Sequence, residues 1–164
     1  VDGIKTGFLT VEKYSLASSL DTGERRLTAV ASGFNTKNSR SRESMRLLNW
    51  GLRKFDTIKI GKKDEAISDL NVWLGKKNKI KVVPAEDIYI TIPKRKKKTI
   101  RAVIEYDGPI AAPVKKGDVV GLLNIYVSDE LKREVDILAA EDIEKLNIFF
   151  RIFKSLNYLV WGDV

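Results

Sequence analysis

The chain has 164 residues, of which 43% are hydrophobic, which is enough to build a packed core in one ordinary domain or two small ones. There are 30 lysines and arginines against 22 aspartates and glutamates, so the formal net charge is +8, which favours an anionic partner. The absence of cysteine excludes disulfides and thiolate metal sites within this chain. The absence of histidine excludes Ser-His-Asp and Cys-His catalysis and histidine-ligated zinc.

The ends of the sequence give a further expectation. The chain starts at Val1 with no methionine, basic leader or apolar signal run, and we expect a fragment that begins inside a strand. No run reaches the roughly 18 uninterrupted apolar residues of a membrane-spanning helix, so no segment is expected to cross a bilayer.

The first third of the chain alternates strand and turn signals. Strands are predicted at residues 3–6, 14–20 and 27–32, and Asp21-Thr22-Gly23-Glu24 forms the last turn, so the pattern predicts an antiparallel meander. Ser41, with Glu43 in the first turn, then predicts the start of a helix. Its apolar positions recur at helical spacing: Met45, Leu47, Leu48, Leu52 and Phe55.

A second region, from about residue 56 to residue 140, is rich in short β-type runs. They are predicted at 69–74, 88–92, 100–106, 119–127 and 135–138. All four prolines lie in this region, together with glycines that separate the runs. We therefore predict a separate all-β domain, a sandwich or a small barrel.

The last stretch, from Ile143 to Trp161, has an apolar helical face opposite a polar face that carries Arg151 and Lys154. On periodicity alone, packing of that face on the β domain is the simpler interpretation. The terminal position and the aromatic density favour a helix that lies in a membrane interface without spanning it.

Lys5-Thr6-Gly7 is a short motif at the start of the meander. Penicillin-recognising serine enzymes use Ser-x-x-Lys, Ser-x-Asn and Lys-Thr-Gly together. In that setting the lysine supplies positive potential beside the nucleophile, and the threonine hydroxyl donates to the terminal carboxylate of the substrate. The glycine lets a peptide lie along the strand edge.

The chain resembles the low-molecular-mass D-alanyl-D-alanine carboxypeptidases, the penicillin-binding serine peptidases that trim peptidoglycan stem peptides. The likeness includes Lys5-Thr6-Gly7, Leu47-Leu48-Asn49-Trp50-Gly51, Ile88-Tyr89-Ile90-Thr91-Ile92-Pro93, and the stretch from Ala112 to Gly121. The resemblance implies an α+β chain. Its predicted parts are a partial penicillin-recognising domain at 1–55, an all-β sandwich-like domain at 56–140, and an amphipathic membrane-anchor helix at 141–164.

The resemblance also implies the site residues. Lys5, Thr6 and Gly7 are carried over as catalytic and substrate-side residues, and the backbone N–H of Phe8 as an oxyanion donor and substrate contact. Arg40 is carried over as a substrate-binding residue. The family commonly has a histidine where this chain has Phe8, which is expected to alter rate or specificity. The membrane-contact residues implied for the last helix are Phe149, Phe150, Phe153 and Trp161.

For the parent protein the resemblance implies a hydrolase of the bacterial cell wall that removes the terminal D-alanine from stem peptides and binds β-lactams. No cofactor or metal is implied, and the implied location is the periplasm or extracytoplasmic face, peripherally attached to the cytoplasmic membrane. Neither Ser-x-x-Lys nor Ser-x-Asn precedes Lys5, so the chain alone is expected to be catalytically silent. An incomplete domain is also expected to self-associate through residues 1–55.

Two other interpretations remain open at this point. The basic run from Lys94 to Lys98 fits a solvated hairpin tip, a contact with anionic lipid or cell wall, or nucleic acid, and the last is disfavoured because the strands carry mainly isoleucine and valine. The chain as a whole also fits a non-catalytic β module that binds a membrane surface, cell wall or partner. Trp50 and Trp73 are predicted in a core or a domain interface.

Overall fold

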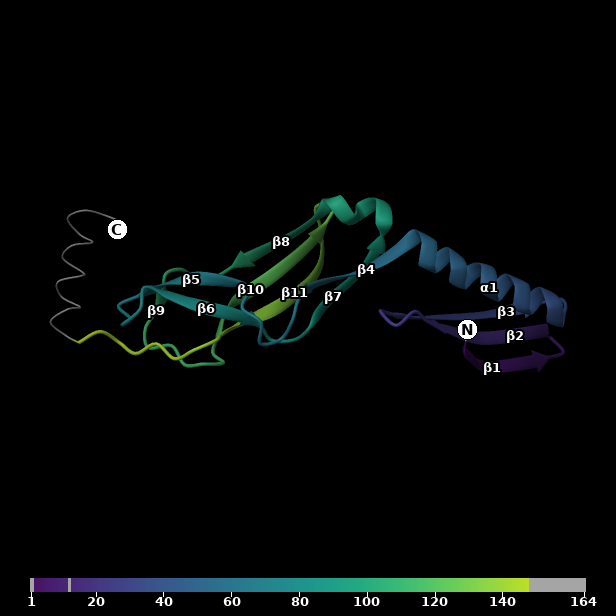
Figure 1. Ribbon diagram of the computed structural model, residues 1–164, viewed down its shortest axis with the longest axis horizontal. Helices are drawn as coiled ribbons and strands as arrows, with labels where there is room; N and C mark the ends of the chain where they lie inside the picture. The colour runs from purple at the N-terminus through teal and green to yellow at the C-terminus, as the bar shows by residue number, and fades with distance from the viewer. Residues whose placement is uncertain (1, 12, 148–164) are drawn as a thin grey trace. The chain divides into compact units, whose positions relative to one another are not determined.

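A computed structural model describes residues 2–11 and 13–147 of the chain. The chain divides into two compact units (Figure 1). Unit 1 comprises residues 1–58 and 91–97, and unit 2 comprises residues 59–90 and 98–164. The structure is mostly β with a single α-helix in its described part, so the predicted prevalence of strands after the first third is confirmed.

Unit 1 contains a three-stranded antiparallel sheet. The strands β1 (Asp2–Leu9), β2 (Lys13–Asp21) and β3 (Arg26–Phe34) are ordered β1-β2-β3, which confirms the predicted meander. The helix α1 (Lys37–Lys54) runs along this sheet (Figure 1). Its buried Leu48 and Gly51 face the sheet, and a Cβ on Gly51 would lie 2.8 Å from Leu27, so the glycine permits close packing.

The helix begins earlier than the sequence predicted. Thr36 is its N-cap: the Thr36 hydroxyl accepts from the Ser39 N–H at 3.1 Å, and the Ser39 hydroxyl accepts from the Thr36 N–H at 3.1 Å. Ser41 therefore lies inside the helix, and Glu43 lies in its second turn. At the other end the guanidinium of Arg25 donates to the carbonyls of Leu52 and Phe55, which satisfies acceptors that the helix end leaves free.

The helix also buries fewer apolar residues than its pattern predicted. Leu48 is buried, whereas Met45, Leu47 and Trp50 are 42%, 41% and 52% exposed. Phe55 belongs to the following strand and makes an edge contact with Trp50 at 5.1 Å between ring centroids. A core position for Trp50 is therefore wrong within the described residues.

The remaining elements are strands and one short 3₁₀ helix. In chain order they are β4 (Phe55–Gly61), β5 (Ser68–Trp73), β6 (Lys79–Pro84), β7 (Ile88–Pro93), η1 (Lys94–Thr99), β8 (Ile100–Glu105), β9 (Ile110–Ala111), β10 (Val119–Val127) and β11 (Glu130–Ala139). One sheet has the order β8-β10-β11-β6-β5-β9, and β4 pairs with β7 in a second, two-stranded sheet. The predicted runs match β5, β7, β8, β10 and part of β11, whereas β4, β6 and β9 were not predicted.

The core of unit 2 is built from alternating strand residues. In β6, the fully buried Ile80 lies between two exposed lysines and Val82 is also fully buried, and in β7 Ile88 and Ile90 alternate with exposed positions. Ile125 and Ile137 contribute fully buried side chains from β10 and β11. This alternation places one face of each strand in a common apolar interior.

Two connection predictions need correction. The basic run is no hairpin tip, because β7 pairs with β4 and β8 pairs with β10, so η1 connects two different sheets. Residues 143–147, predicted to start the terminal helix, are not helical: Ile143 and Lys145 form isolated β-bridges with Val114 and Gly75. The rest of that predicted helix lies outside the described residues.

Candidate functional site

The Lys-Thr-Gly motif lies on β1, which is an edge strand of the unit 1 sheet. Lys5 pairs in register with Ala17, and Thr6 pairs with Leu16. Side chains alternate along a strand, so Lys5 and Gly7 lie on the face opposite α1, whereas Thr6 lies on the same face as α1. Both Lys5 and Thr6 are exposed, and neither side chain has a hydrogen-bond or ion-pair partner among residues 2–11 and 13–147.

Gly7 lies directly opposite Ser15 on β2. A Cβ at Gly7 would lie 2.5 Å from the Ser15 hydroxyl oxygen, which is closer than real Cβ atoms come to a neighbour. The pairing of β1 with β2 therefore leaves little room beside Gly7, and a larger residue there would require the Ser15 hydroxyl to rotate, a constraint that the sequence pattern did not indicate.

Phe8 and Arg40 are brought together by a residue that the sequence did not single out. The rings of Phe8 and Tyr14 are 4.7 Å apart between centroids, and the Arg40 guanidinium lies 5.7 Å from the centroid of the same Tyr14 ring. The Nε of Arg40 is buried without a hydrogen-bond partner among the described residues. Tyr14 stands opposite Phe8 in the β1–β2 register, so hairpin pairing is the signal that could have identified it.

The sheet face opposite α1 carries exposed apolar side chains. The register places Lys5, Ala17 and Val30 in one row across that face, and Val30 is 76% exposed. Other large apolar side chains of unit 1 are also more than half exposed: Ile4, Phe8, Leu9 and Val11. A surface of this kind is typical of a docking face.

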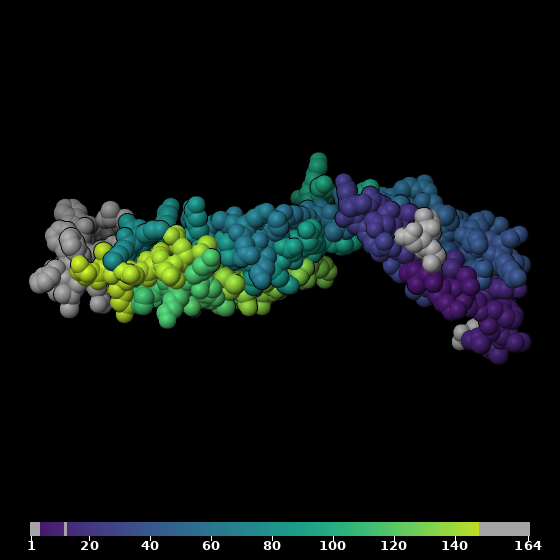
Figure 2. Space-filling model, turned by 60° about the horizontal axis from the view of Figure 1, so that its bottom comes forward, coloured from purple at the N-terminus to yellow at the C-terminus, as the bar shows by residue number. Residues whose placement is uncertain are grey.

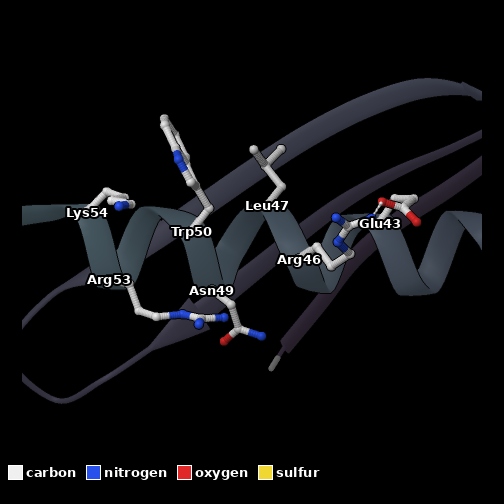
Figure 3. A pocket seen from close by; sticks show the side chains of 7 residues that line it. All are labelled: Glu43, Arg46, Leu47, Asn49, Trp50, Arg53 and Lys54. Carbon is white, nitrogen blue, oxygen red and sulfur yellow. Dashed lines mark hydrogen bonds and ion pairs between the residues drawn. The ribbon is translucent and has the colours of Figure 1, made fainter.

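An open pocket lies on the outer side of α1 (Figure 3). It is lined by Glu43, Arg46, Leu47, Asn49, Trp50, Arg53 and Lys54. Leu47 and Trp50 point to the same side of the helix in this view. The Arg42 and Arg46 guanidinium groups donate to Glu43 at 3.1 Å and 2.8 Å, and the hydrogen bond from Arg42 is the main reason that the pKa of Glu43 is lowered.

Three further findings concern metal ligands and membrane segments. No three histidine, cysteine, aspartate or glutamate side chains gather into a metal site in the part of the chain that the structure describes. Among the same residues no helix is both long and apolar enough to span a membrane. The predicted membrane-contact residues Phe149, Phe150, Phe153 and Trp161 lie outside the described residues.

Comparisons with known proteins agree on one family. The family described as "Penicillin-binding protein 5, C-terminal domain" matches residues 55–145. D-alanyl-D-alanine carboxypeptidase DacC of Escherichia coli (strain K12) is 32% identical over 98% of this chain and 41% of its own length. D-alanyl-D-alanine carboxypeptidase DacA of Haemophilus influenzae is 33% identical over 99% of this chain and 42% of its own length.

A solved structure supports the same assignment. The crystal structure of penicillin binding protein 5 from Haemophilus influenzae is similar with a TM-score of 0.72 and 31% identity, covering 87% of this chain and 42% of that one. The chain therefore spans about two fifths of the length of the curated relatives that it matches. The predicted resemblance to the C-terminal portion of these carboxypeptidases is confirmed, and the chain belongs to the penicillin-binding protein 5 C-terminal domain family.

Proposed function

We propose that this chain is the C-terminal portion of a serine-type D-alanyl-D-alanine carboxypeptidase that trims stem peptides of peptidoglycan and binds β-lactams. The observation that carries the proposal is the Lys-Thr-Gly motif on an exposed edge strand, in a chain whose relatives are named D-alanyl-D-alanine carboxypeptidases. An edge strand has free backbone groups, so a peptide can add to it as a further strand.

Each motif residue has a proposed role in this setting. The Lys5 ammonium supplies positive potential on the face opposite α1, and the Thr6 hydroxyl donates to the terminal carboxylate of the peptide. Gly7 keeps the strand close to β2, and the Phe8 N–H donates to the oxyanion. Arg40 provides a second cation for the substrate, held near β1 by its contact with Tyr14.

The nucleophilic serine is proposed to come from a part of the parent protein beyond these 164 residues. The exposed row of Lys5, Ala17 and Val30 supports a docking face for that part, because burial of Val30 and its neighbours would stabilise the contact. The proposed parts are a segment of the catalytic domain at 1–55, a β-rich domain at 56–140 and an amphipathic anchor at 141–164. Alone, the chain is proposed to be inactive.

The proposed location is the extracytoplasmic side of the bacterial cytoplasmic membrane. Cell-wall substrates lie outside the cytoplasm, and the relatives are enzymes named for such substrates. Peripheral attachment through the terminal amphipathic stretch is supported by its sequence pattern, with an apolar face, flanking cations and terminal aromatics.

The test uses the protein encoded by the complete parent gene. The wild type should be labelled by a fluorescent penicillin and should release D-alanine from a diacyl-Lys-D-Ala-D-Ala peptide. Thr6→Val should lower kcat/KM about ten- to hundred-fold, because it removes a hydrogen bond to a charged group. Thr10→Val, in the exposed turn after β1, is the matched control and should leave activity unchanged. Absence of penicillin labelling in the wild type would refute the proposal.

A further inference from the structure

The net positive charge of this protein belongs to one of its two units. Unit 1 carries 14 lysines and arginines against 6 aspartates and glutamates, whereas unit 2 carries 16 of each kind. The whole formal net charge of +8 therefore belongs to unit 1. A charge asymmetry of this size attracts an anionic partner to one part of a molecule.

Part of that charge gathers where α1 ends and η1 begins. Arg53 and Lys54 occupy the last turn of α1, and Lys94 and Arg95 are the first two residues of η1. We name these four exposed cations the basic surface. None of the four has an ion-pair partner among the residues that the structure describes. In the space-filling view the teal-green side chains around η1 protrude into solvent (Figure 2).

Contacts inside unit 1 tie the two halves of the basic surface together. The Asp56 carboxylate, two residues after Lys54, lies 3.8 Å from the Lys97 ammonium. The hydroxyl groups of Thr57 and Thr91 are 2.9 Å apart, which joins the strand after α1 to the strand before η1. Asp56 thus connects the strand after α1 to Lys97 of η1.

The cations at the end of α1 and in η1 repel one another, which destabilises the protein when no anionic ligand is bound. In a 3₁₀ helix the residues at i and i+3 lie on the same side, so Lys94 and Lys97 share one side of η1. Like charges at such short range repel, and the negative end of the α1 dipole compensates only the cations in its own last turn. An anionic ligand that spans both elements would relieve this repulsion.

We infer that the basic surface is a secondary, non-catalytic binding surface for a carboxylate-rich peptide polymer. The inference rests on the proposed function, because peptides that end in a free carboxylate and repeat along a polymer present an array of negative charges. Carboxylates match exposed lysines and arginines in charge and hydrogen bonding. Such a surface would hold the polymer near the Lys-Thr-Gly strand, which belongs to the same unit.

The experiment uses the 164-residue chain and poly-L-glutamate as a soluble polycarboxylate probe, with binding followed by fluorescence anisotropy. The variant Arg53→Gln, Lys54→Gln, Lys94→Gln, Arg95→Gln should weaken binding about ten-fold or more. Binding of the wild type should also weaken as salt rises from about 50 mM to about 300 mM, since salt screens exposed charges.

The matched control removes the same number of positive charges from unit 2. Lys63, Lys79, Lys81 and Lys116 are exposed there, and their joint replacement by glutamine should change the affinity less than about two-fold. Equal losses in the two variants would show that only net charge matters and would overturn the inference. Unchanged binding in the unit 1 variant would also overturn it, provided that both variants keep the thermal unfolding of the wild type.

Two further arms separate this surface from other anionic partners and from the proposed function. Polyphosphate or anionic phospholipid vesicles that bind more tightly than poly-L-glutamate, with the same loss in the unit 1 variant, would assign the surface to phosphate groups and overturn the inference. Binding of the polymer does not require the nucleophilic serine. A failure here therefore leaves penicillin labelling of the parent protein intact, and the two proposals fail separately.

Discussion

At the scale of single residues, Gly7 shows how a motif position can have a structural cause as well as a chemical one. A side chain added at Gly7 would meet the hydroxyl of Ser15 on the neighbouring strand, which would have to rotate away. We predict that Gly7→Ala lowers the free energy of unfolding by about 0.5–1 kcal/mol, because the Ser15 hydroxyl must leave its present rotamer. Ser15→Ala removes the atom that clashes, so the double variant should regain most of that loss in a double-mutant cycle measured by urea unfolding.

Additive losses in that cycle would contradict the predicted contact. The same cycle separates stability from catalysis, because Ser15 has no proposed role in the reaction. If the double variant is stable but the parent protein stays inactive with it, access of the peptide to the strand also requires the glycine.

Asp21 gives a prediction on pH dependence. The Gly23 N–H donates to one carboxylate oxygen at 2.8 Å and Arg26 donates to the other at 2.9 Å, so the pKa of Asp21 is lowered, mainly by the hydrogen bond from Gly23. A lowered pKa in the folded state means that this interaction stabilises the fold above the unfolded-state pKa. That contribution is lost as the pH falls through the folded-state value.

Carboxyl titration by NMR measures this directly. The pKa of Asp21 in the folded chain should be lower than the pKa of the same residue in an unfolded peptide of the same sequence. A pKa equal to or above that of the peptide would show that the hydrogen bonds in this turn do not stabilise the ionised carboxylate.

At the scale of elements, the start of α1 depends on Thr36 rather than on Ser41. The Thr36 hydroxyl accepts from a backbone N–H at the first turn, whereas the Ser41 hydroxyl donates to the carbonyl of Lys37 within the helix. We predict that Thr36→Ala lowers the free energy of unfolding by about 1 kcal/mol. Ser41→Ala is the control and should change it by less than about 0.5 kcal/mol. A larger loss of thermal stability for Ser41→Ala than for Thr36→Ala would indicate that Ser41 is the N-cap.

The segment after β11 is fixed to unit 2 through Ile143. This side chain is 2% exposed, its backbone N–H donates to the Val114 carbonyl at 2.8 Å, and nearby Glu144 pairs with Lys76 at 2.5 Å. We predict that Ile143→Ala costs about 2–4 kcal/mol of unfolding free energy through loss of burial and a cavity.

A matched control for this change is Leu131→Ala, because Leu131 is 47% exposed. It should cost less than about 1 kcal/mol in the same urea titration. Glu144→Gln should also have a small effect, because both members of its ion pair are largely exposed. Similar losses for Ile143 and Leu131 would indicate that the segment is not packed as described.

At the scale of the whole molecule, the exposed apolar face of unit 1 predicts self-association of the 164-residue chain. Val30 and Val11 are 76% and 92% exposed, and β1 and β3 are both edge strands of their sheet. Sedimentation velocity across micromolar concentrations should show species larger than a monomer. Val30→Asp should shift the distribution toward monomer, because it places a charge in the centre of the exposed face. A monodisperse monomer for the wild type would contradict this prediction.

The sequence by itself determined the meander, the β-rich middle region and the family resemblance. These depend on patterns within a few residues, such as the alternation of isoleucine with exposed residues in β7 and the Lys-Thr-Gly tripeptide of β1. Such local patterns can be recognised from the sequence alone. Element boundaries were less certain, because Ser41 and Thr36 are both good caps and only the backbone shows which hydroxyl meets a free N–H.

Only the tertiary structure decided which distant residues meet. The contacts of Tyr14 with Phe8 and Arg40, the close approach of Gly7 to Ser15, and the hydrogen bond between Thr57 of β4 and Thr91 of β7 all depend on strand register and packing across the chain. The same is true of η1. The sequence predicts a hairpin tip for a basic run between two strands, but the sheets show that β7 pairs with β4 and β8 pairs with β10. The physical reason is that strands pair so as to bury a whole apolar sheet face. That face is built from segments far apart in the sequence, so no single segment specifies it.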